Sequence, residues 1–254
     1  FVNSFVGSAF LSQNGRFRAE TKARKKLKTT LTPMKAWGEF DKWKGMALNA
    51  YSIDHELAHI ASKLPFYGPF RENSLHIHFD GGASLSNCSV YIYRNGELQI
   101  HDYHWKLSHL SKFFNDNALT FALLNHRPGE HCAVPGKLMG FATMGMANQE
   151  LKDWLQSHAY FKEMWEDHGP FYQAARADFG WQGTLGDTRD PFLQHIAASF
   201  KQTFQEDWLG YLQELKTIVN ADYLYLSGGC ALNIVANTLI VDSGLFQDVF
   251  IPPC

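Results

Sequence analysis

The residues best suited to chemistry lie in segment 54–62, which contains the sequence His55-Glu56-Leu57-Ala58-His59. Residues four apart on a helix lie one above the other, so His55 and His59 can offer two imidazoles to one metal ion. An isolated pair of histidines is more often part of an ordinary buried helix, but Glu56 between them makes the pattern more specific. A metal site is therefore the first hypothesis for this segment.

The same five residues match the H-E-x-x-H pattern of zinc peptidases, in which Glu56 would be the general base for a metal-bound water. The longer form of that motif fails, because Ser62 stands at its glycine position and Pro65 at its last histidine. A peptidase would then need a downstream carboxylate such as Glu72 or Glu97 as its third ligand. Neither carboxylate lies on an obvious second helix.

A carboxylate follows the next apolar segment. Residues 75–79 are typical of a strand, and Asp80 comes directly after them, before Gly81-Gly82. Glycines at a strand end let the backbone approach a phosphate or a metal closely, although a plain turn explains them equally well. Two further strands are expected on either side of Arg94-Asn95-Gly96, which is a good hairpin signal.

The end of the chain carries a pattern typical of nucleotide-binding turns. A short apolar strand over 223–226 precedes Ser227-Gly228-Gly229, a helix is expected over 231–239, and a second strand over 248–251. Amides at the start of such a helix can face a phosphate, and glycines leave room for it. Tight packing at a turn is the ordinary alternative.

The rest of the chain is predicted to alternate helices and loops. Helices are expected over 49–64, 108–124 and 148–166. A glycine-punctuated loop that holds Lys137 is expected over 128–145, and an aromatic-rich loop or short elements over 167–189. Asp190 and Pro191 should start the longest helix. Its predicted buried stripe comprises Phe192, Ile196, Phe200, Phe204, Trp208, Tyr211, Leu215 and Ile218.

Composition favours a globular protein. The 254 residues are 45% hydrophobic, which suits one large domain or two lobes. The net charge of −2 provides no overall field for nucleic acid or an anionic membrane, and the basic run 22–28 is typical of a solvated helix face. No apolar run approaches the ~18 residues needed to cross a bilayer.

The four cysteines, at positions 88, 132, 230 and 254, form no C-x-x-C pair, so we expect free thiols in a reducing cytoplasm. The chain begins without Met and ends on Ile251-Pro252-Pro253-Cys254, which predicts a piece of a longer protein. The oligomeric state is left open, with a homodimer as one option.

Three blocks taken together, in this order, resemble the O-carbamoyltransferases of nodulation-factor and antibiotic biosynthesis. They are residues 54–62, residues 136–145 and residues 226–237, which read DHELAHIAS, GKLMGFATMG and LSGGCALNIVAN. The resemblance covers roughly residues 50–254. It implies an α/β protein with the actin-like ATPase fold of sugar kinases and actin, incomplete at both ends, with 1–254 as one N-terminal-type domain and 1–50 loosely assigned.

The resemblance also implies an activity and its cofactors. A carbamoyl group, derived from carbamoyl phosphate and ATP through a carbamoyl adenylate, would be passed to a hydroxyl of a small-molecule acceptor beside a divalent metal, most simply iron. His55, His59 and Asp80 resemble the metal ligands. The residues that resemble the nucleotide contacts are Lys137, Gly140, Gly228, Gly229 and Asn233.

This chain departs from the family pattern at several places. Family members often carry a second His where Glu56 stands and an acidic residue where Pro135 stands. A further acidic metal ligand would lie past Cys254, and only hairpin-like character over 8–17 matches the family's opening phosphate-binding hairpin. Besides the zinc peptidase, a non-catalytic nucleotide-binding module therefore stays open as an alternative.

Overall fold

The computed structural model divides the chain into two compact units. Unit 1 comprises residues 1–106, 219–232 and 246–254, and unit 2 comprises residues 107–218 and 233–245. The structure describes residues 34–35, 42–43, 46–47, 51–52, 55–81, 86–104, 107, 110, 117–127, 129–130 and 132–253. The basic run 22–28, the hairpin-like segment 8–17, Gly82 and Cys254 lie outside the described residues.

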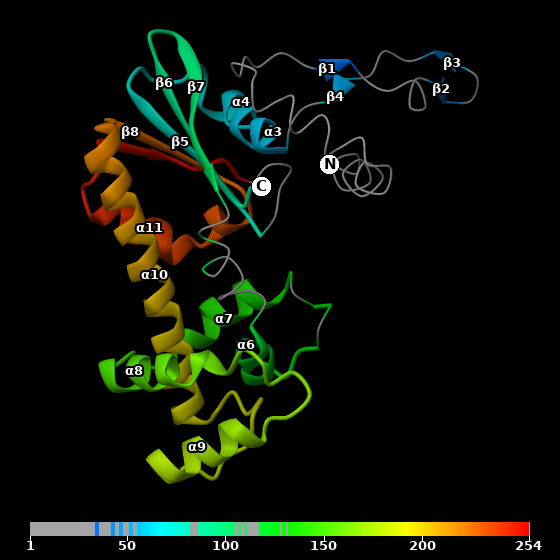
Figure 1. Ribbon diagram of the computed structural model, residues 1–254, viewed down its shortest axis with the longest axis vertical. Coiled ribbons are helices and arrows are strands. Elements are labelled where there is room, and N and C mark those ends of the chain that lie inside the picture. Colours follow the sequence, from blue (N-terminus) through cyan, green and yellow to red (C-terminus); the bar gives the residue numbers. More distant parts are fainter. Residues whose placement is uncertain are drawn as a thin grey trace. The chain divides into compact units, whose positions relative to one another are not determined.

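Unit 1 is built on a five-stranded mixed sheet, in the order β7-β6-β5-β8-β9. The strands are β5 (Ser74–Phe79), β6 (Cys88–Arg94), β7 (Glu97–His104), β8 (Tyr223–Ser227) and β9 (Asp248–Phe250). β5, β6 and β7 are antiparallel, whereas β8 lies parallel to β5 and β9 parallel to β8. Chain segments nearly 150 residues apart in sequence therefore meet at β5, in the centre of the sheet (Figure 1).

The β6–β7 connection confirms the predicted hairpin. Asn95 and Gly96 have φ of 55° and 74°, the left-handed values that a two-residue type I′ turn requires at both central positions. Two further strand pairs precede the sheet: β1 (Met34–Lys35) pairs with β4 (Tyr51–Ser52), and β2 (Lys42–Trp43) pairs with β3 (Met46–Ala47). Because β4 lies within the helix predicted over 49–64, that helix begins later than expected.

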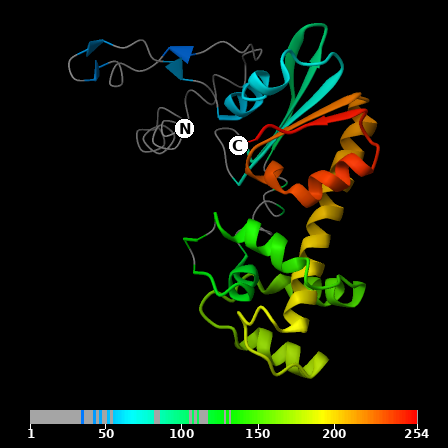
Figure 2. The same cartoon turned by 180° about the vertical axis from the view of Figure 1, so that it is seen from behind.

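That helix is α3 (His55–Ala61), and it lies beside β5 in both views (Figures 1 and 2). Its inner residues Leu57 and Ile60 pack in one hydrophobic cluster with Tyr91, Leu98 and Tyr225 of the sheet. A short helix, α4 (Leu64–Tyr67), follows. Pro65 stands in its first turn, where a missing N–H costs nothing, so Pro65 starts a helix instead of ending one.

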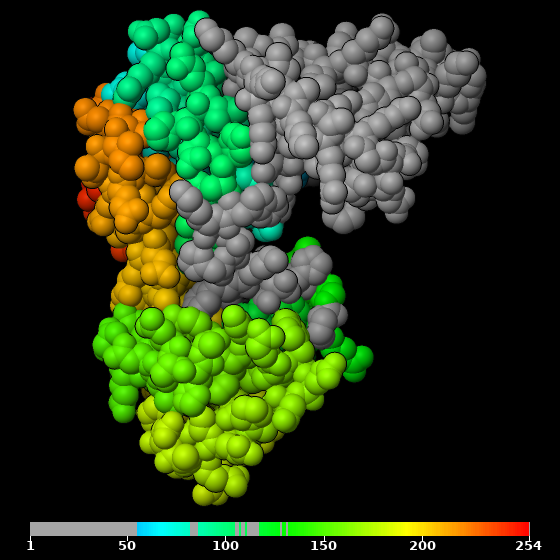
Figure 3. Space-filling model, in the orientation of Figure 1, coloured from blue at the N-terminus to red at the C-terminus, as the bar shows by residue number. Residues whose placement is uncertain are grey.

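Unit 2 is helical, with α6 (Ala118–Leu123), α7 (Val134–Ala142), α8 (Gln149–Ser157), η1 (Ala159–Phe161), α9 (Gly169–Phe179), α10 (Pro191–Val219) and α11 (Ile234–Asp242). The last residue of α10 and the short η2 (Gly229–Leu232) belong to unit 1. The green and yellow side chains of α8 and α9 lie against one another in the space-filling view (Figure 3). Trp154 of α8 contacts Phe171 and Phe179 of α9, with ring centroids 5.8 and 5.2 Å apart.

The loop predicted over 128–145 is wrong for most of its length, whereas 167–189 contains one of the short elements that were expected. Residues 134–142 form α7, because Val134, Leu138 and Phe141 recur at helical spacing and are buried, which outweighs the glycines. Within 167–189, α9 forms around the buried Phe171 and Ala175.

The longest helix begins as predicted, since the Asp190 side chain accepts hydrogen bonds from the amides of Phe192 and Leu193. Ile218 departs from the predicted buried stripe, because it is 69% exposed near the end of α10.

The sheet and its helices confirm the predicted α/β class. Among the described residues, no helix combines the length and the apolar character that a membrane crossing requires.

A lysine is buried beneath the sheet of unit 1. Lys63 follows α3, is fully buried, and donates a hydrogen bond from Nζ to the backbone oxygen of Tyr225, 3.2 Å away. Burial lowers the pKa of Lys63 well below its ordinary value, because a charged amine is poorly solvated there. The folded protein therefore binds fewer protons than the unfolded chain at every pH between the lowered pKa and the ordinary one.

Replacing Lys63 by Met should raise the free energy of unfolding, most strongly at the acidic end of that interval. Stability of the native protein rises with pH wherever the unfolded state binds more protons, and the K63M variant lacks this contribution. The stability difference between K63M and the native protein should therefore shrink as pH rises from about 7 towards about 10, the ordinary lysine pKa. Urea unfolding at several pH values measures it, with the exposed Lys162→Met as the control that shows no trend.

Candidate metal centre

Four polar side chains of unit 1 converge at one end of β5. They are His55 and His59 on α3, His78 on β5, and Asp80 directly after β5. The Nε2 atoms of His55, His59 and His78 lie 4.0, 3.8 and 3.9 Å from Asp80 Oδ2. One nitrogen or oxygen from each of the four side chains lies within 4.8 Å of all the others.

Local structure explains this convergence. His55 and His59 are one helical turn apart on α3, whose opposite side is fixed to the core by Leu57 and Ile60. Side chains alternate between the two faces of a strand, so His76 and His78 share one face of β5, and Leu75, Ile77 and Phe79 share the other. The predicted pairing of two helix histidines with a carboxylate at the strand end is thus found in the structure.

The electrostatics of His59, His78 and Asp80 suit metal ligation, which needs neutral imidazole and ionised carboxylate, whereas His55 would have to lose a proton more readily held than usual. The carboxylate of Asp80 raises the pKa of His55, whereas burial lowers that of His59 and brings that of His78 to about 3. Burial would raise the pKa of Asp80, but His55 and the amides of Gly229 and Gly81 outweigh it and bring this pKa to about 2.

The predicted nucleotide turn lies directly against this cluster. The Gly229 amide donates to Asp80 Oδ2 at 3.1 Å, while the Gly81 amide donates to Oδ1 at 2.6 Å. Gly228 has φ of 93°, and a Cβ added there would lie only 2.3 Å from the backbone oxygen of Phe79. The turn after β8 can therefore approach the end of β5 only because position 228 has no side chain.

The spacing of the cluster is slightly wider than one bound ion allows. Two ligand atoms on one ion cannot lie farther apart than two metal–ligand bonds, which is about 4.2 Å for bonds of about 2.1 Å. All three histidine distances to Asp80 Oδ2 are below this limit, whereas the four ligand atoms as a set lie within 4.8 Å of one another. Side chains must therefore move together by up to about 0.6 Å for all four atoms to bind one ion. In addition, His55 Nε2 is buried without a hydrogen-bond partner among the described residues.

The other predicted nucleotide contacts are placed as follows. Asn233 caps α11, since its side-chain oxygen accepts a hydrogen bond from the Ala236 amide, 3.1 Å away. Lys137 is exposed on α7, with Nζ 3.0 Å from His126 Nε2, and Gly140 is exposed on the same helix. All three belong to unit 2, whereas the metal cluster and the Gly228–Gly229 turn belong to unit 1.

The three glutamates that a zinc peptidase would use lie outside this cluster. Glu56 is fully buried and accepts a hydrogen bond from the Ser86 amide, so it lacks the contact with solvent that activating a water would need. Glu72 accepts from the amides of Asn95 and Gly96 in the β6–β7 turn. Glu97 accepts from Gln99 on β7. The H-E-x-x-H match therefore lacks an accessible base, and the carboxylate beside its two histidines is Asp80 instead of Glu72 or Glu97.

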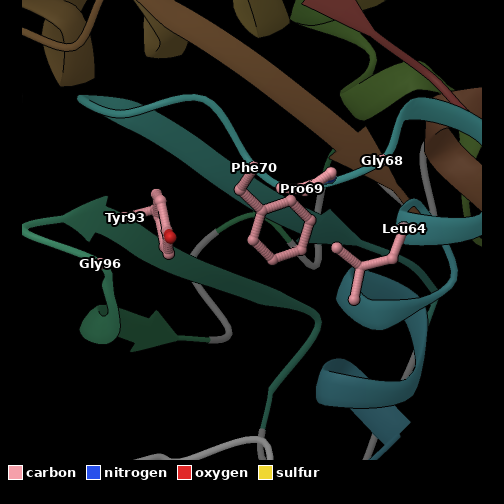
Figure 4. Close-up of a pocket in the computed structure, with 6 residues that line it drawn as sticks. All are labelled: Leu64, Gly68, Pro69, Phe70, Tyr93 and Gly96. Atoms are coloured by element: carbon pink, nitrogen blue, oxygen red, sulfur yellow. The ribbon is translucent and has the colours of Figure 1, made fainter.

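A separate depression on unit 1 is apolar. Its lining residues are Leu64, Gly68, Pro69, Phe70, Tyr93 and Gly96 (Figure 4). The rings of Phe70 and Tyr93 stand edge to face, with centroids 5.7 Å apart. None of these residues belongs to the group of His55, His59, His78 and Asp80, so this depression does not contribute to the candidate site.

Sequence reasoning missed one member of the cluster, His78. The signal was present, because residues 78 and 80 follow the strand alternation and the helix histidines had already indicated a metal. His76 lies on the same face of β5, so the sequence does not show which of the two histidines is the ligand. The structure shows that His76 is structural: its ring stacks on Tyr225 with centroids 4.4 Å apart, and its Nε2 lies 2.9 Å from Ser74 Oγ.

Comparison with known proteins identifies the family. The model of the carbamoyltransferase N-terminus matches residues 14–254, so the chain belongs to this family. The predicted family is thereby confirmed, and membership supports carbamoyl transfer in general terms.

One solved structure and the curated proteins complete the comparison. A ROK family glucokinase from Streptomyces griseus, in complex with glucose and AMPPNP, is similar at 12% identity, with a TM-score of 0.33. The match covers 82% of this chain and 64% of the glucokinase chain, which is less than two thirds of its length. This likeness places no residue or ligand in the present chain. A search of curated proteins finds no match.

Replacing Gly228 by Ala should destabilise the protein by about 1–3 kcal/mol, because the new methyl group meets the Phe79 carbonyl and the backbone is left-handed. Gly96→Ala is the matched control, since Gly96 also has positive φ but nothing lies within 4 Å of its added Cβ. Urea unfolding of both variants separates the backbone cost from the collision. Equal destabilisation would contradict the close approach of the two segments.

Proposed function

We propose that this chain is the part of a carbamoyltransferase that holds a carbamoyl adenylate beside a divalent metal ion. The carbamoyl group then passes to a hydroxyl of a small-molecule acceptor. Membership of the family supports the transfer itself. The observation that carries the finer assignment is the hydrogen bond from Gly229 to Asp80, which links the predicted nucleotide turn to the predicted metal ligand.

In this proposal His55, His59 and Asp80 hold the ion, which is iron or a similar divalent metal. Such an ion would offset negative charge on the adenylate phosphate as AMP departs. The turn of Gly228 and Gly229 lies along the nucleotide in this proposal. Gly229 is exposed, whereas Gly228 is buried. Lys137, Gly140 and Asn233 complete the nucleotide contacts by their resemblance to the family pattern.

The reaction replaces one bond to carbon by another. The hydroxyl oxygen of the acceptor attacks the carbamoyl carbon, the bond from that carbon to the phosphate oxygen breaks, and AMP leaves with the electron pair. The acceptor loses its hydroxyl proton to solvent, since no protein base is assigned. Carbamoyl phosphate and ATP are the proposed source of the adenylate.

Replacing His55 or His59 by Ala should lower zinc and iron affinity by more than about 100-fold, because loss of even a residue supporting a ligand costs about 10–100-fold. Metal analysis after dialysis against a competing chelator measures the loss. His158→Ala is the control, because His158 also faces a carboxylate, with Nε2 3.9 Å from Asp178 Oδ2, but stands outside the cluster. Unchanged metal content in the His55 and His59 variants would refute the site.

Replacing Lys137 by Ala should weaken AMP binding to the metal-loaded chain by about tenfold or more. A hydrogen bond to a charged group contributes about 1.5–3 kcal/mol, and about 1.4 kcal/mol is a factor of ten. Isothermal titration calorimetry measures the affinity, with Lys162→Ala as the matched exposed control of unit 2. Equal AMP affinities in the native and Lys137 variant proteins would remove Lys137 from the site, and a native protein without AMP affinity would refute the nucleotide assignment.

A further inference from the structure

His78 is a buried histidine whose two ring nitrogens make no hydrogen bond to the described residues. Its side chain is fully buried, and neither Nδ1 nor Nε2 has a hydrogen-bond partner among the described residues. Leaving a buried polar atom without a partner is unfavourable, so such atoms are rare in folded proteins. His76 is equally buried and lacks a partner only at Nδ1, whereas His78 lacks one at both nitrogens, so His78 is the histidine of β5 that is suited to bind a ligand.

The neighbouring strands do not supply that partner. His78 is paired with Ser89 on β6 and with Ser227 on β8, the two polar side chains that flank it in the sheet. The Ser89 hydroxyl lies 2.7 Å from the Ser86 hydroxyl, and the Ser227 hydroxyl donates to the backbone oxygen of Ile77 at 3.3 Å. Both hydroxyls are thus engaged elsewhere.

His78 instead faces the other three members of the cluster. Its ring centroid lies 5.4 Å from that of His55 and 4.9 Å from that of His59. Its Nε2 is 3.9 Å from Asp80 Oδ2, within the range that the two helix histidines span. By the same limit of about 4.2 Å, His78 Nε2 and Asp80 Oδ2 can share one ion.

We propose that His78 is a fourth protein ligand of the divalent metal, through Nε2, so that the ion is held by three imidazoles and one carboxylate. This inference rests on the proposed function only in requiring that His55, His59 and Asp80 bind an ion. All four ligands then come from residues 55–80.

The exposure of the four side chains shows which side of the site is open to solvent. The side chains of His55, His59 and Asp80 are each 26% exposed, whereas that of His78 is 0% exposed. His78 therefore binds the ion from the buried side, and the exposed side stays open for an oxygen of the substrate.

The three imidazole ligands also determine which metals the site should favour. Imidazole suits zinc, iron, copper and nickel, whereas magnesium and calcium favour sites made of oxygen. We therefore expect a transition metal that excess magnesium does not displace.

Cobalt(II) and zinc(II) binding to the 254-residue chain tests this assignment. Replacing His78 by Gln should lower zinc affinity by about 10-fold to 100-fold or more and change the visible ligand-field spectrum of the bound cobalt. His76→Gln is the matched control, because His76 is equally buried on the same face of β5 but lies outside the cluster. It should change neither the affinity nor the spectrum.

The outcomes separate this inference from the proposed function. Native affinity and an unchanged cobalt spectrum in the His78 variant, together with loss of metal in His55→Ala, would overturn the role of His78 and leave the function standing. A weaker affinity with an unchanged spectrum would make His78 a positioning residue and would also overturn the inference. Metal retained after His55→Ala would instead refute the proposed site.

A measurement on the native chain covers the case in which the His78 variant fails to fold. X-ray absorption of the zinc-loaded native protein counts the imidazoles bound to the ion. Three imidazoles support His78 as a ligand, and two overturn it. Retention of zinc in excess magnesium supports the nitrogen-rich site, whereas displacement by magnesium contradicts it.

Discussion

The candidate site depends on one close approach, that of the turn after β8 to the end of β5. Position 228 must be glycine, since a Cβ would lie 2.3 Å from the Phe79 oxygen, and the next amide then reaches Asp80. This contact joins segments 149 residues apart in sequence. It also fixes the orientation of the carboxylate, whose second oxygen accepts from the Gly81 amide. A rigid carboxylate is what a preorganised metal site needs.

Sheet order explains why these segments meet. β8 lies parallel to β5, with Ile77 opposite Leu226 and His78 opposite Ser227, so both strands end at the same edge of the sheet. The chain leaves that edge through Asp80 after β5 and through Gly228 after β8. α3 supplies the remaining ligands, because its apolar residues pack against the face of the sheet that carries His76 and His78. The metal cluster is thus a consequence of register and helix packing, and no long loop is needed to assemble it.

Much of this could be predicted from the sequence, and the failures have physical causes. His55 and His59 could be singled out because the helix period is simple, and Asn95-Gly96 specifies its own turn. Asp80 could be assigned as a ligand only through the resemblance to the family. The helix at 134–142 was missed because glycines weigh against a helix locally, whereas burial of Leu138 and Phe141 decides the outcome. His78 was missed because only tertiary structure shows which of two alternating histidines faces a helix and which stacks on Tyr225.

The site also explains why an H-E-x-x-H sequence need not make a peptidase. In such a motif both histidines share one helix face, and the intervening residue projects to a different side. Here that side is buried, and Glu56 binds the Ser86 amide. The proposed ion would be approached instead from the exposed side, where His55, His59 and Asp80 remain about one quarter exposed and where Gly229 is also exposed.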